Sequence, residues 1–238
     1  MLNKIIIYSN NKIKYDPFDS DSNTLALFDF RKNQSYSTDL CGNTWTLSNS
    51  SSSITHSISF TENGLVTSGK VLACSKTPTQ LNGNKTLKPF TMEGFVALNV
   101  REQRSQDVFL VKNNNTTARL IGIALTSESN ANLSYLHVWA ASSTYLSSPK
   151  LEVGQFYHVA LTCDSNSQCK YYVNGILCVY TTVTVSPTNV YILGNPDYTN
   201  SQDRTAKATI ASYRLSNIVR YTENFSDRVD LKNLRIIE

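Results

Sequence analysis

Apolar and polar residues alternate along much of this 238-residue chain, without a stripe of helical period. The clearest stretch is 154–175, GQFYHVALTCDSNSQCKYYVNG, whose aromatic and β-branched residues predict two strands joined by a polar turn. An Asn-Gly dipeptide at 174–175 predicts a second tight turn, because both residues tolerate a positive φ. Counting from the turn centres pairs Leu161 with Tyr171, and Tyr171 with Cys178. The stretch therefore predicts an antiparallel meander.

A second informative strand is predicted at 133–140, where small or aliphatic residues occupy the even positions, as a sandwich core requires. The odd positions carry larger side chains: Leu133, Tyr135, His137 and Trp139. Tyr145 lies just beyond them. If the even face is core, the aromatic row lies on the outer, concave face of its sheet. The alternatives are that the row is itself core, or that a partner subunit buries it.

The stretch 90–98 alternates in the same way. Phe90, Met92, Val96 and Leu98 share one face, and Glu93, Phe95 and Ala97 share the other. We expect Glu93 and Phe95 to be neighbours of the aromatic row on the outer face.

Shorter signals complete the organisation of the chain. Residues 1–24 predict an N-terminal arm or edge strand, 25–226 a single sandwich domain, and 227–238 a last strand that pairs with the N-terminal one. Further strands are expected at 25–30, 107–112, 119–126, 189–194 and 207–215. Residues 216–221 predict one helical turn with Ser216 as its N-cap.

Composition excludes several classes of protein. Charged residues make up 17% of the chain, and the net charge of +4 comes from basic residues scattered without a block or stripe. A nucleic-acid surface requires clustering, so none is expected. No run approaches the roughly eighteen apolar residues of a membrane span. The apolar run near the N-terminus is too short for a signal peptide, which predicts synthesis in a host cytoplasm.

The five cysteines form no framework spacing, and their odd number indicates free thiols in a reducing compartment. Cys163 and Cys169 flank the same polar turn and are expected directly opposite each other. Cross-strand Cβ separations of about 4.5–5.5 Å are slightly long for a relaxed disulfide, which favours the reduced pair. A disulfide between them is the alternative.

Four stretches, in matching order, resemble the laminin-G-like (concanavalin A-like) jelly-roll domains. They are 154–175; Asp29 with STDLCGNTWTL at 37–47; FTMEGFV at 90–96, with Phe95 where tryptophan is usual; and ATIASYRLSNIVRYTENF at 208–225. The resemblance implies an all-β fold, a two-sheet antiparallel jelly-roll sandwich in a single domain. The R-Y-T-x-N-F ending is similar to that of laminin-G-like modules in bacteriophage tail proteins.

Catalytic signatures are missing from the sequence. Glycan-cleaving enzymes on this fold carry an E-x-D-x-x-E arrangement, because acid and nucleophile must face the scissile bond about 5–5.5 Å apart. No such arrangement occurs, and Glu93 is the lone carboxylate of its predicted strand. A G-x-S-x-G nucleophile elbow is also missing. The expectation is therefore that the chain is not an enzyme.

Binding is the better class of function. Sugar rings pack their C–H faces on aromatic rings, with polar groups nearby to fix orientation. The candidate glycan-binding residues are Tyr135, His137, Trp139, Tyr145, Glu93 and Phe95. Some laminin-G-like modules bind at the loop rim with calcium, so the resemblance implies Asp197 and Asp203 as metal ligands; otherwise no cofactor is expected. A weak calcium loop at Asp19 and Asp21 is the alternative to a solvated connector.

The hypothesis that follows is a non-enzymatic virion protein of a phage tail, fibre or baseplate that attaches to a glycan on the host surface. Its partners would be other virion proteins and copies of itself, since such proteins usually assemble symmetrically. One alternative is a purely structural decoration or assembly protein that binds no glycan. Another is a secreted bacterial adhesin module.

Overall fold

The computed structural model describes residues 19–49, 57–67, 70–74, 81, 87–100, 106–112, 121–127, 134–140, 143–183, 189–193, 206–225, 229–230 and 235–236. In residues 48–49, 70–74, 106, 112, 125–127, 134–140, 143–150, 229–230 and 235–236 the description is of the backbone. The predicted arm at 1–15, the loop at 195–205 and the linkage of the C-terminal residues to the N-terminal arm lie outside the described residues.

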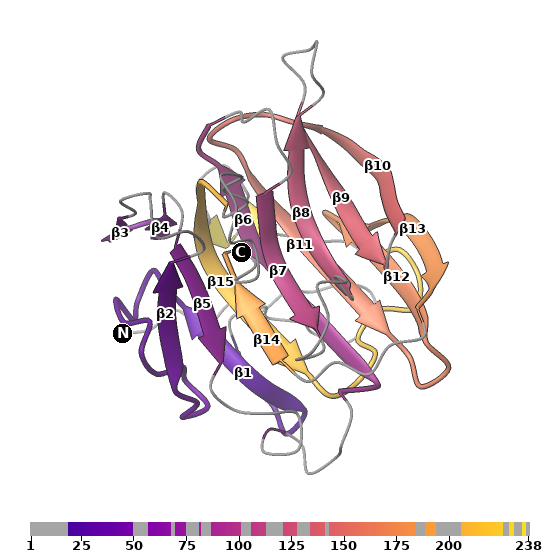
Figure 1. Cartoon of the computed structure of the whole chain (residues 1–238), viewed down its shortest axis with the longest axis horizontal. Coiled ribbons are helices and arrows are strands. Elements are labelled where there is room, and N and C mark those ends of the chain that lie inside the picture. The colour runs from indigo at the N-terminus through magenta and orange to yellow at the C-terminus, as the bar shows by residue number, and fades with distance from the viewer. Residues whose placement is uncertain are drawn as a thin grey trace.

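Two antiparallel sheets packed face to face form the two layers seen in Figure 1. One has eight strands: β1 (Thr24–Asp29), β3 (Ile58–Thr61), β4 (Gly64–Thr67), β6 (Phe90–Leu98), β11 (Phe156–Cys163), β12 (Gln168–Val173), β13 (Ile176–Thr182) and β15 (Ala208–Ser216). The other has seven: β2 (Trp45–Asn49), β5 (Lys70–Cys74), β7 (Gln106–Lys112), β8 (Ile121–Ser127), β9 (Ser134–Ala140), β10 (Ser143–Leu151) and β14 (Asn189–Ile192). The predicted all-β, two-sheet antiparallel jelly-roll sandwich is confirmed.

Strand order shows how distant segments meet. The eight-stranded sheet runs β13-β12-β11-β6-β15-β4-β3, with β1 also paired to β15, and the seven-stranded sheet runs β10-β9-β8-β7-β14-β5-β2. The last long strand, β15, thus lies at the centre of its sheet, between β6 and the strands β1 and β4. The short strands β16 (Val229–Asp230) and β17 (Arg235–Ile236) pair with each other.

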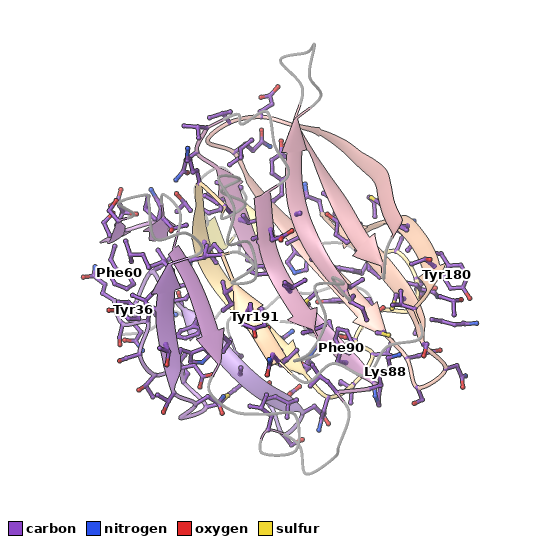
Figure 2. All side chains as sticks on the ribbon, in the orientation of Figure 1. Tyr36, Phe60, Lys88, Phe90, Tyr180 and Tyr191 are labelled. Carbon is purple, nitrogen blue, oxygen red and sulfur yellow. The ribbon has the colours of Figure 1, made fainter. Side chains whose placement is uncertain are left out.

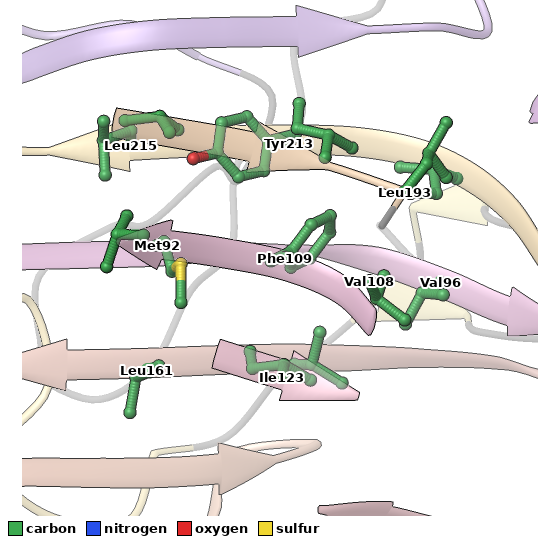
Figure 3. Packing of buried hydrophobic residues seen from close by; sticks show 14 of the residues in the cluster. Met92, Val96, Val108, Phe109, Ile123, Leu161, Leu193, Tyr213 and Leu215 are labelled. Atoms are coloured by element: carbon green, nitrogen blue, oxygen red, sulfur yellow. The ribbon is translucent and has the colours of Figure 1, made fainter. Parts of the chain in front are cut away.

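The core lies between the two sheets. All four residues predicted for the inner face of β6 are buried in it: Phe90, Met92, Val96 and Leu98. Figure 3 shows Met92, Leu161 and Leu215 of one sheet packing with Phe109 and Ile123 of the other. The alternation of apolar residues therefore predicts the buried face correctly, because successive strand residues point to opposite faces.

The β11–β12–β13 meander agrees with the sequence except at one position. Leu161 pairs with Tyr171, as predicted, and the turn at Asn174 and Gly175 has φ values of 48° and 79°. A bulge between β12 and β13 then pairs Tyr171 with Val179, so the predicted partner Cys178 is wrong by one residue. One extra residue in a strand shifts every later pair in this way.

The helical turn predicted at 216–221 does not form. Ser216 is the last residue of β15, and the chain continues in bends. The Ser216 hydroxyl accepts a hydrogen bond from Arg220 Nε (2.7 Å) and so does not cap backbone amides. The Arg220 amide donates to Thr91 Oγ1 instead (3.0 Å), which ties the segment to β6. In the part of the chain that the structure describes, no helix is long and apolar enough to span a membrane.

Candidate functional site

The backbone register places the predicted aromatic row on the outer face of the seven-stranded sheet, the face turned away from the core. Directly paired residues share a face of a sheet. Positions 138 and 140 pair with Ile123 and Ile121, which belong to the core. The positions of Tyr135, His137 and Trp139 alternate with these and therefore lie on the outer face. They pair with Thr126, Ala124 and Gly122.

Tyr145 is not brought to the same face. The register pairs Tyr145 with Val138, which is an inner-face position, whereas Thr144 and Leu146 pair with the positions of Trp139 and His137. The expectation that Tyr145 extends the row is therefore wrong. β10 runs antiparallel to β9, and the connection between the two strands decides which residues of β10 share a face with the aromatic row. The sequence alone does not define that register.

Several other described residues of this outer face are buried. Tyr191 pairs with Leu110, and Leu110 pairs with Gly122. Gly122 in turn pairs with Trp139, so these positions form one row across the outer face of the sheet. Leu110 is 1% exposed and Tyr191 9%, and the two pack on each other. Tyr191 lies near the middle of the front sheet in Figure 2, and its hydroxyl accepts a hydrogen bond from Asn189 Nδ2 (2.9 Å). This part of the outer face is therefore closed to a ligand.

Glu93 and Phe95 belong to the other sheet. They lie on β6, whereas the aromatic row lies on β9 of the seven-stranded sheet, so the expectation that these residues are neighbours is wrong. Both side chains are 0% exposed. The physical reason is that alternation defines two faces for each strand but does not define which sheet the strand joins.

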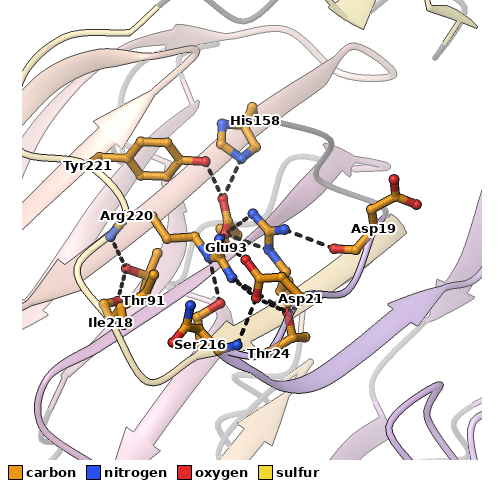
Figure 4. A network of polar contacts seen from close by, with 12 residues as sticks. Asp19, Asp21, Thr24, Thr91, Glu93, His158, Ser216, Ile218, Arg220 and Tyr221 are labelled. Carbon is orange, nitrogen blue, oxygen red and sulfur yellow. Dashed lines mark hydrogen bonds and ion pairs between the residues drawn. The ribbon is translucent and has the colours of Figure 1, made fainter. Parts of the chain in front are cut away.

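Glu93 instead lies at the centre of a buried ionic network, drawn in Figure 4. Arg214 donates to Glu93 Oε1 from Nε (3.0 Å) and Nη2 (2.9 Å), and the Tyr221 hydroxyl donates to Oε2 (2.7 Å). His158 Nε2 lies 3.3 Å from Oε2, and Arg220 Nε lies 3.8 Å from Oε1. A carboxylate this deeply buried requires such partners, because an uncompensated buried charge costs about 3–5 kcal/mol.

The second half of the network reaches the surface. Arg220 donates from Nη1 and Nη2 to the two carboxylate oxygens of Asp21 (2.9 and 2.8 Å). Arg214 Nη1 donates to the backbone oxygen of Asp19 (3.0 Å). Two carboxylates and two guanidiniums therefore balance one another. The Arg220 hydrogen bonds lower the pKa of Asp21 to about 2.

Aromatic rings cover this network. The Tyr221 and Phe225 rings stack at 3.8 Å between centroids, and both lie against Tyr172 and His158. The Phe95 ring lies 5.0 Å from His158. The segment 217–225 thus covers part of the outer face of the eight-stranded sheet, and its contacts are structural.

The stretch DLCGNTW likewise serves the fold. Asp39 is buried, and its Oδ1 accepts hydrogen bonds from the amides of Cys41 and Asn43 (both 2.9 Å). Its Oδ2 accepts from Asn43 Nδ2 (2.7 Å) and from the Trp45 indole (3.0 Å). This arrangement holds the loop before β2 and orients Trp45 in the core.

No group of three or more metal-ligating side chains occurs among the residues that the structure describes. Asp197 and Asp203 lie outside those residues, so calcium at the loop rim stays a prediction. The alternative of a calcium loop at Asp19 and Asp21 is not supported, because the Asp21 carboxylate is paired with Arg220.

Sequence reasoning did not place Arg214, Arg220, Tyr221 and His158 together. Each belongs to a stretch that carries the laminin-G-like resemblance, so the sequence did mark these stretches as important to the fold. The spacing could not show that these residues converge on Glu93, because Glu93 and Tyr221 are 128 residues apart.

Together, the two facing antiparallel sheets and the segment folded across one of them define a jelly-roll sandwich of the concanavalin A type. The chain belongs to the concanavalin A-like lectin/glucanases superfamily, in a laminin-G-like family whose model matches residues 74–224. The comparison with curated protein sequences found no significant match.

Solved structures share the fold at low sequence identity. Trypanosoma rangeli sialidase in complex with sialic acid superposes with a TM-score of 0.64 and 16% identity over 85% of this chain. The match covers 32% of the sialidase, so the chain spans about a third of that protein. Domain 4 of AbnA, a GH43 extracellular arabinanase from Geobacillus stearothermophilus in complex with arabinotriose, matches at a TM-score of 0.54 and 16% identity. There the alignment covers 89% of this chain and 98% of that domain.

Proposed function

We propose that this chain is a non-catalytic glycan-binding module whose ligand stacks on the outer face of the seven-stranded sheet. The observation that carries the proposal is the register that gathers the positions of Tyr135, His137 and Trp139 on that face. Their partners on β8 include the small residues Gly122 and Ala124. Rows of ring-bearing residues suit sugars, because the C–H face of a pyranose packs on an aromatic ring.

The surroundings of Glu93 support binding over glycan cleavage. Most glycosidases hydrolyse their substrate with two carboxyl groups about 5–9.5 Å apart and open to the sugar. Glu93 pairs across the sheet with Ala160 on one side and with Arg214 on the other. Its side chain is fully buried, so it has no access to a sugar in this structure.

The structural relatives support a carbohydrate as the ligand class. Domain 4 of the arabinanase matches this chain over nearly its whole length and is described as a complex with arabinotriose. The sialidase match covers only part of that enzyme. The arabinanase domain, which matches as a whole domain and is in complex with an oligosaccharide, is therefore a better guide to the function of this chain than the sialidase.

The proposed setting is a phage virion, in which the module attaches the tail, fibre or baseplate to a host-surface glycan. The support is the closing stretch RYTENF at 220–225, which is similar to phage tail modules. Other virion proteins and further copies of the chain are the proposed partners. Calcium held by Asp197 and Asp203 would be an additional ligand contact at the loop rim.

A second candidate function, a purely structural role, is favoured by one observation. Leu110, Asp107 and Ala124 lie on the same outer face and are 1%, 1% and 0% exposed. A face that is buried in the isolated chain serves the fold, and only its uncovered part is open to a ligand. The extent of that part decides between the two functions.

A glycan array probed with three proteins separates these functions. Wild type should bind a restricted set of glycans, and Trp139→Ala should lose about tenfold or more of the signal, as expected for a central aromatic anchor. Tyr180→Ala is the matched control, because Tyr180 is an exposed aromatic (54%) on β13 of the other sheet, at the right-hand edge of Figure 2.

The outcomes are distinct. Loss only in Trp139→Ala supports the proposed face, provided that the variant melts at the wild-type temperature. Equal binding by all three proteins rejects that face, and loss only in Tyr180→Ala moves the site to β13. Absence of binding by wild type favours the structural role.

A further inference from the structure

Two thiols face each other at the end of the β11–β12 hairpin. Cys163 and Cys169 are directly paired across the strands, as the sequence predicts. Cys169 Sγ donates a hydrogen bond to Cys163 Sγ over 2.9 Å, and the residues are 1% and 0% exposed, respectively. Neither takes part in the proposed glycan-binding face, which lies on the other sheet.

The backbone already holds the pair in a geometry that a disulfide accepts. The Asp164 amide donates to the Gln168 oxygen (2.9 Å), so the next pair toward the sheet, Cys163 and Cys169, is a non-hydrogen-bonded pair. Such pairs have Cα atoms about 4.5 Å apart and close side chains. Disulfides span Cα separations of about 4.4–6.8 Å, so bridging needs no large backbone movement.

The two thiols are not equivalent. The hydrogen bond from Cys169 lowers the pKa of Cys163, and the positive charge of Lys88 acts in the same direction. The hydrogen bond that Cys169 donates raises its own pKa, as does its burial. Lys88 is fixed nearby, since its Nζ donates to Ser167 Oγ (2.7 Å) and to the Val183 oxygen (2.8 Å). Cys163 is therefore the thiol that reacts first with an electrophile.

We propose that Cys163 and Cys169 form an oxidisable dithiol, a modification site at which a hydroperoxide closes a disulfide across the hairpin. The Cys163 thiolate attacks one oxygen of hydrogen peroxide, which breaks the O–O bond, gives a sulfenic acid and releases hydroxide. The Cys169 sulfur then attacks the Cys163 sulfur, forms the S–S bond and displaces the hydroxyl group as water. Peroxide is reduced, and the dithiol is oxidised by two electrons.

Access requires only local opening of the hairpin end. The two cysteines flank a turn in which Ser165 and Asn166 are exposed, and the oxidant is a small molecule. Cys41, which is exposed, and Cys178, which is half-buried, serve as internal controls. Their thiols contact the backbone oxygens of Thr24 and Ile176.

The test compares the full chain treated with hydrogen peroxide and with a reductant, each quenched with an alkylating agent before digestion. Trypsin releases both cysteines in one peptide, 151–170, because Lys150 and Lys170 bound it. The oxidised peptide should lose two hydrogen atoms and take no alkyl group, whereas the reduced peptide should take two. A second cleavage on the N-terminal side of Asp164 separates the cysteines, so only a disulfide keeps the pieces together.

Melting temperatures of the oxidised and the reduced full-length chain, measured before alkylation, give a second readout. Closure of a short loop should raise Tm by about 5 °C in oxidised wild type. Cys163→Ser with Cys169→Ser should abolish the shift, and Cys178→Ser should retain it. Lys88→Met should slow closure severalfold and give the same product.

Three results would overturn the proposal. One is a peptide 151–170 that gains oxygen without losing two hydrogen atoms. Another is a pair that still takes two alkyl groups after peroxide treatment. The third is a bridge from Cys163 or Cys169 to Cys41 or Cys178.

Discussion

At the scale of single residues, Gly175 meets two requirements at once. Its φ of 79° lies in the left-handed region, which residues with a Cβ adopt only at a cost. A Cβ at this position would also run into the carbonyl oxygen of Phe225. The Phe225 amide donates to the Gly175 oxygen (2.9 Å), so the turn is a docking point for the segment 217–225.

Gly175→Ala should therefore be much more destabilising than Gly154→Ala. Gly154 has a φ of 81°, and a Cβ there would meet nothing within 4 Å, so this substitution tests the backbone strain alone. Strain of this kind costs about 1–2 kcal/mol. Displacement of the segment at residue 175 should bring the total to roughly 3–4 kcal/mol. Urea unfolding of both variants measures the difference, and equal losses would show that the Phe225 contact contributes nothing.

At the scale of elements, the segment 217–225 is held on the eight-stranded sheet by contacts distributed along its length. The Ile218 oxygen accepts from Thr91 Oγ1 (2.7 Å), and the Thr222 oxygen accepts from Lys170 Nζ (2.7 Å). The Leu177 amide donates to Asn224 Oδ1 (2.8 Å). An extended segment satisfies its polar groups with the strands below it and does not need helical hydrogen bonds.

The Asp21–Arg220 pair should make stability depend on acid pH. The pKa of Asp21 is about 2 in the folded chain, below its ordinary 3.8, because the Arg220 hydrogen bonds favour the carboxylate. The contribution is therefore fully present above pH 3.8 and is lost as the pH falls toward 2. Since Asp21 is partly exposed, the effect should be modest.

Melting temperatures of wild type and Asp21→Asn, measured between about pH 6 and pH 2, test this linkage. The wild-type advantage should disappear at the acid end, where the Asp21 carboxyl is protonated. Curves that stay parallel across the whole range would contradict a contribution from this carboxylate. Comparison of the two proteins removes the effect of the other titrating groups.

Local sequence patterns predict strands well and sheet membership poorly. The inner face of β6 and the β11–β12 hairpin follow from alternation and turn residues within a few positions of each other. In contrast, β6 and β9 carry similar alternation and lie in different sheets, because pairing depends on segments far apart in the chain. The bulge between β12 and β13 could not be predicted either, because Cys178 and Val179 are both apolar and either could pair with Tyr171.

The same limit applied to the candidate site. Alternation along β9 identified the outer-face positions of Tyr135, His137 and Trp139, and the register agrees with that alternation. Tyr145 was assigned to the row from its nearness in sequence, but it pairs with an inner-face position. Glu93 was assigned as a ligand contact because it lies on the face of its strand opposite Phe90, Met92, Val96 and Leu98, which was expected to adjoin the aromatic row. Its partners come from β11, β15 and the segment after it.

At the scale of the whole molecule, the two outer faces of the sandwich differ. The outer face of the eight-stranded sheet is covered in part by the aromatic residues Tyr221 and Phe225 and by the ionic network below them. The outer face of the seven-stranded sheet carries the ring-bearing positions on β9. The motif residues on the eight-stranded sheet hold the fold together, and the recognition surface that we propose lies on the opposite sheet.

Amide chemical-shift mapping tests that assignment most directly, using isotope-labelled protein and the oligosaccharide that binds best on the array. The largest changes should occur along β8 and β9, including the amides of Gly122 and Ala124, and the amides of Leu177 and Tyr180 on β13 should stay in place. Changes confined to β12 and β13 would contradict recognition by the seven-stranded sheet, as would a titration without any change.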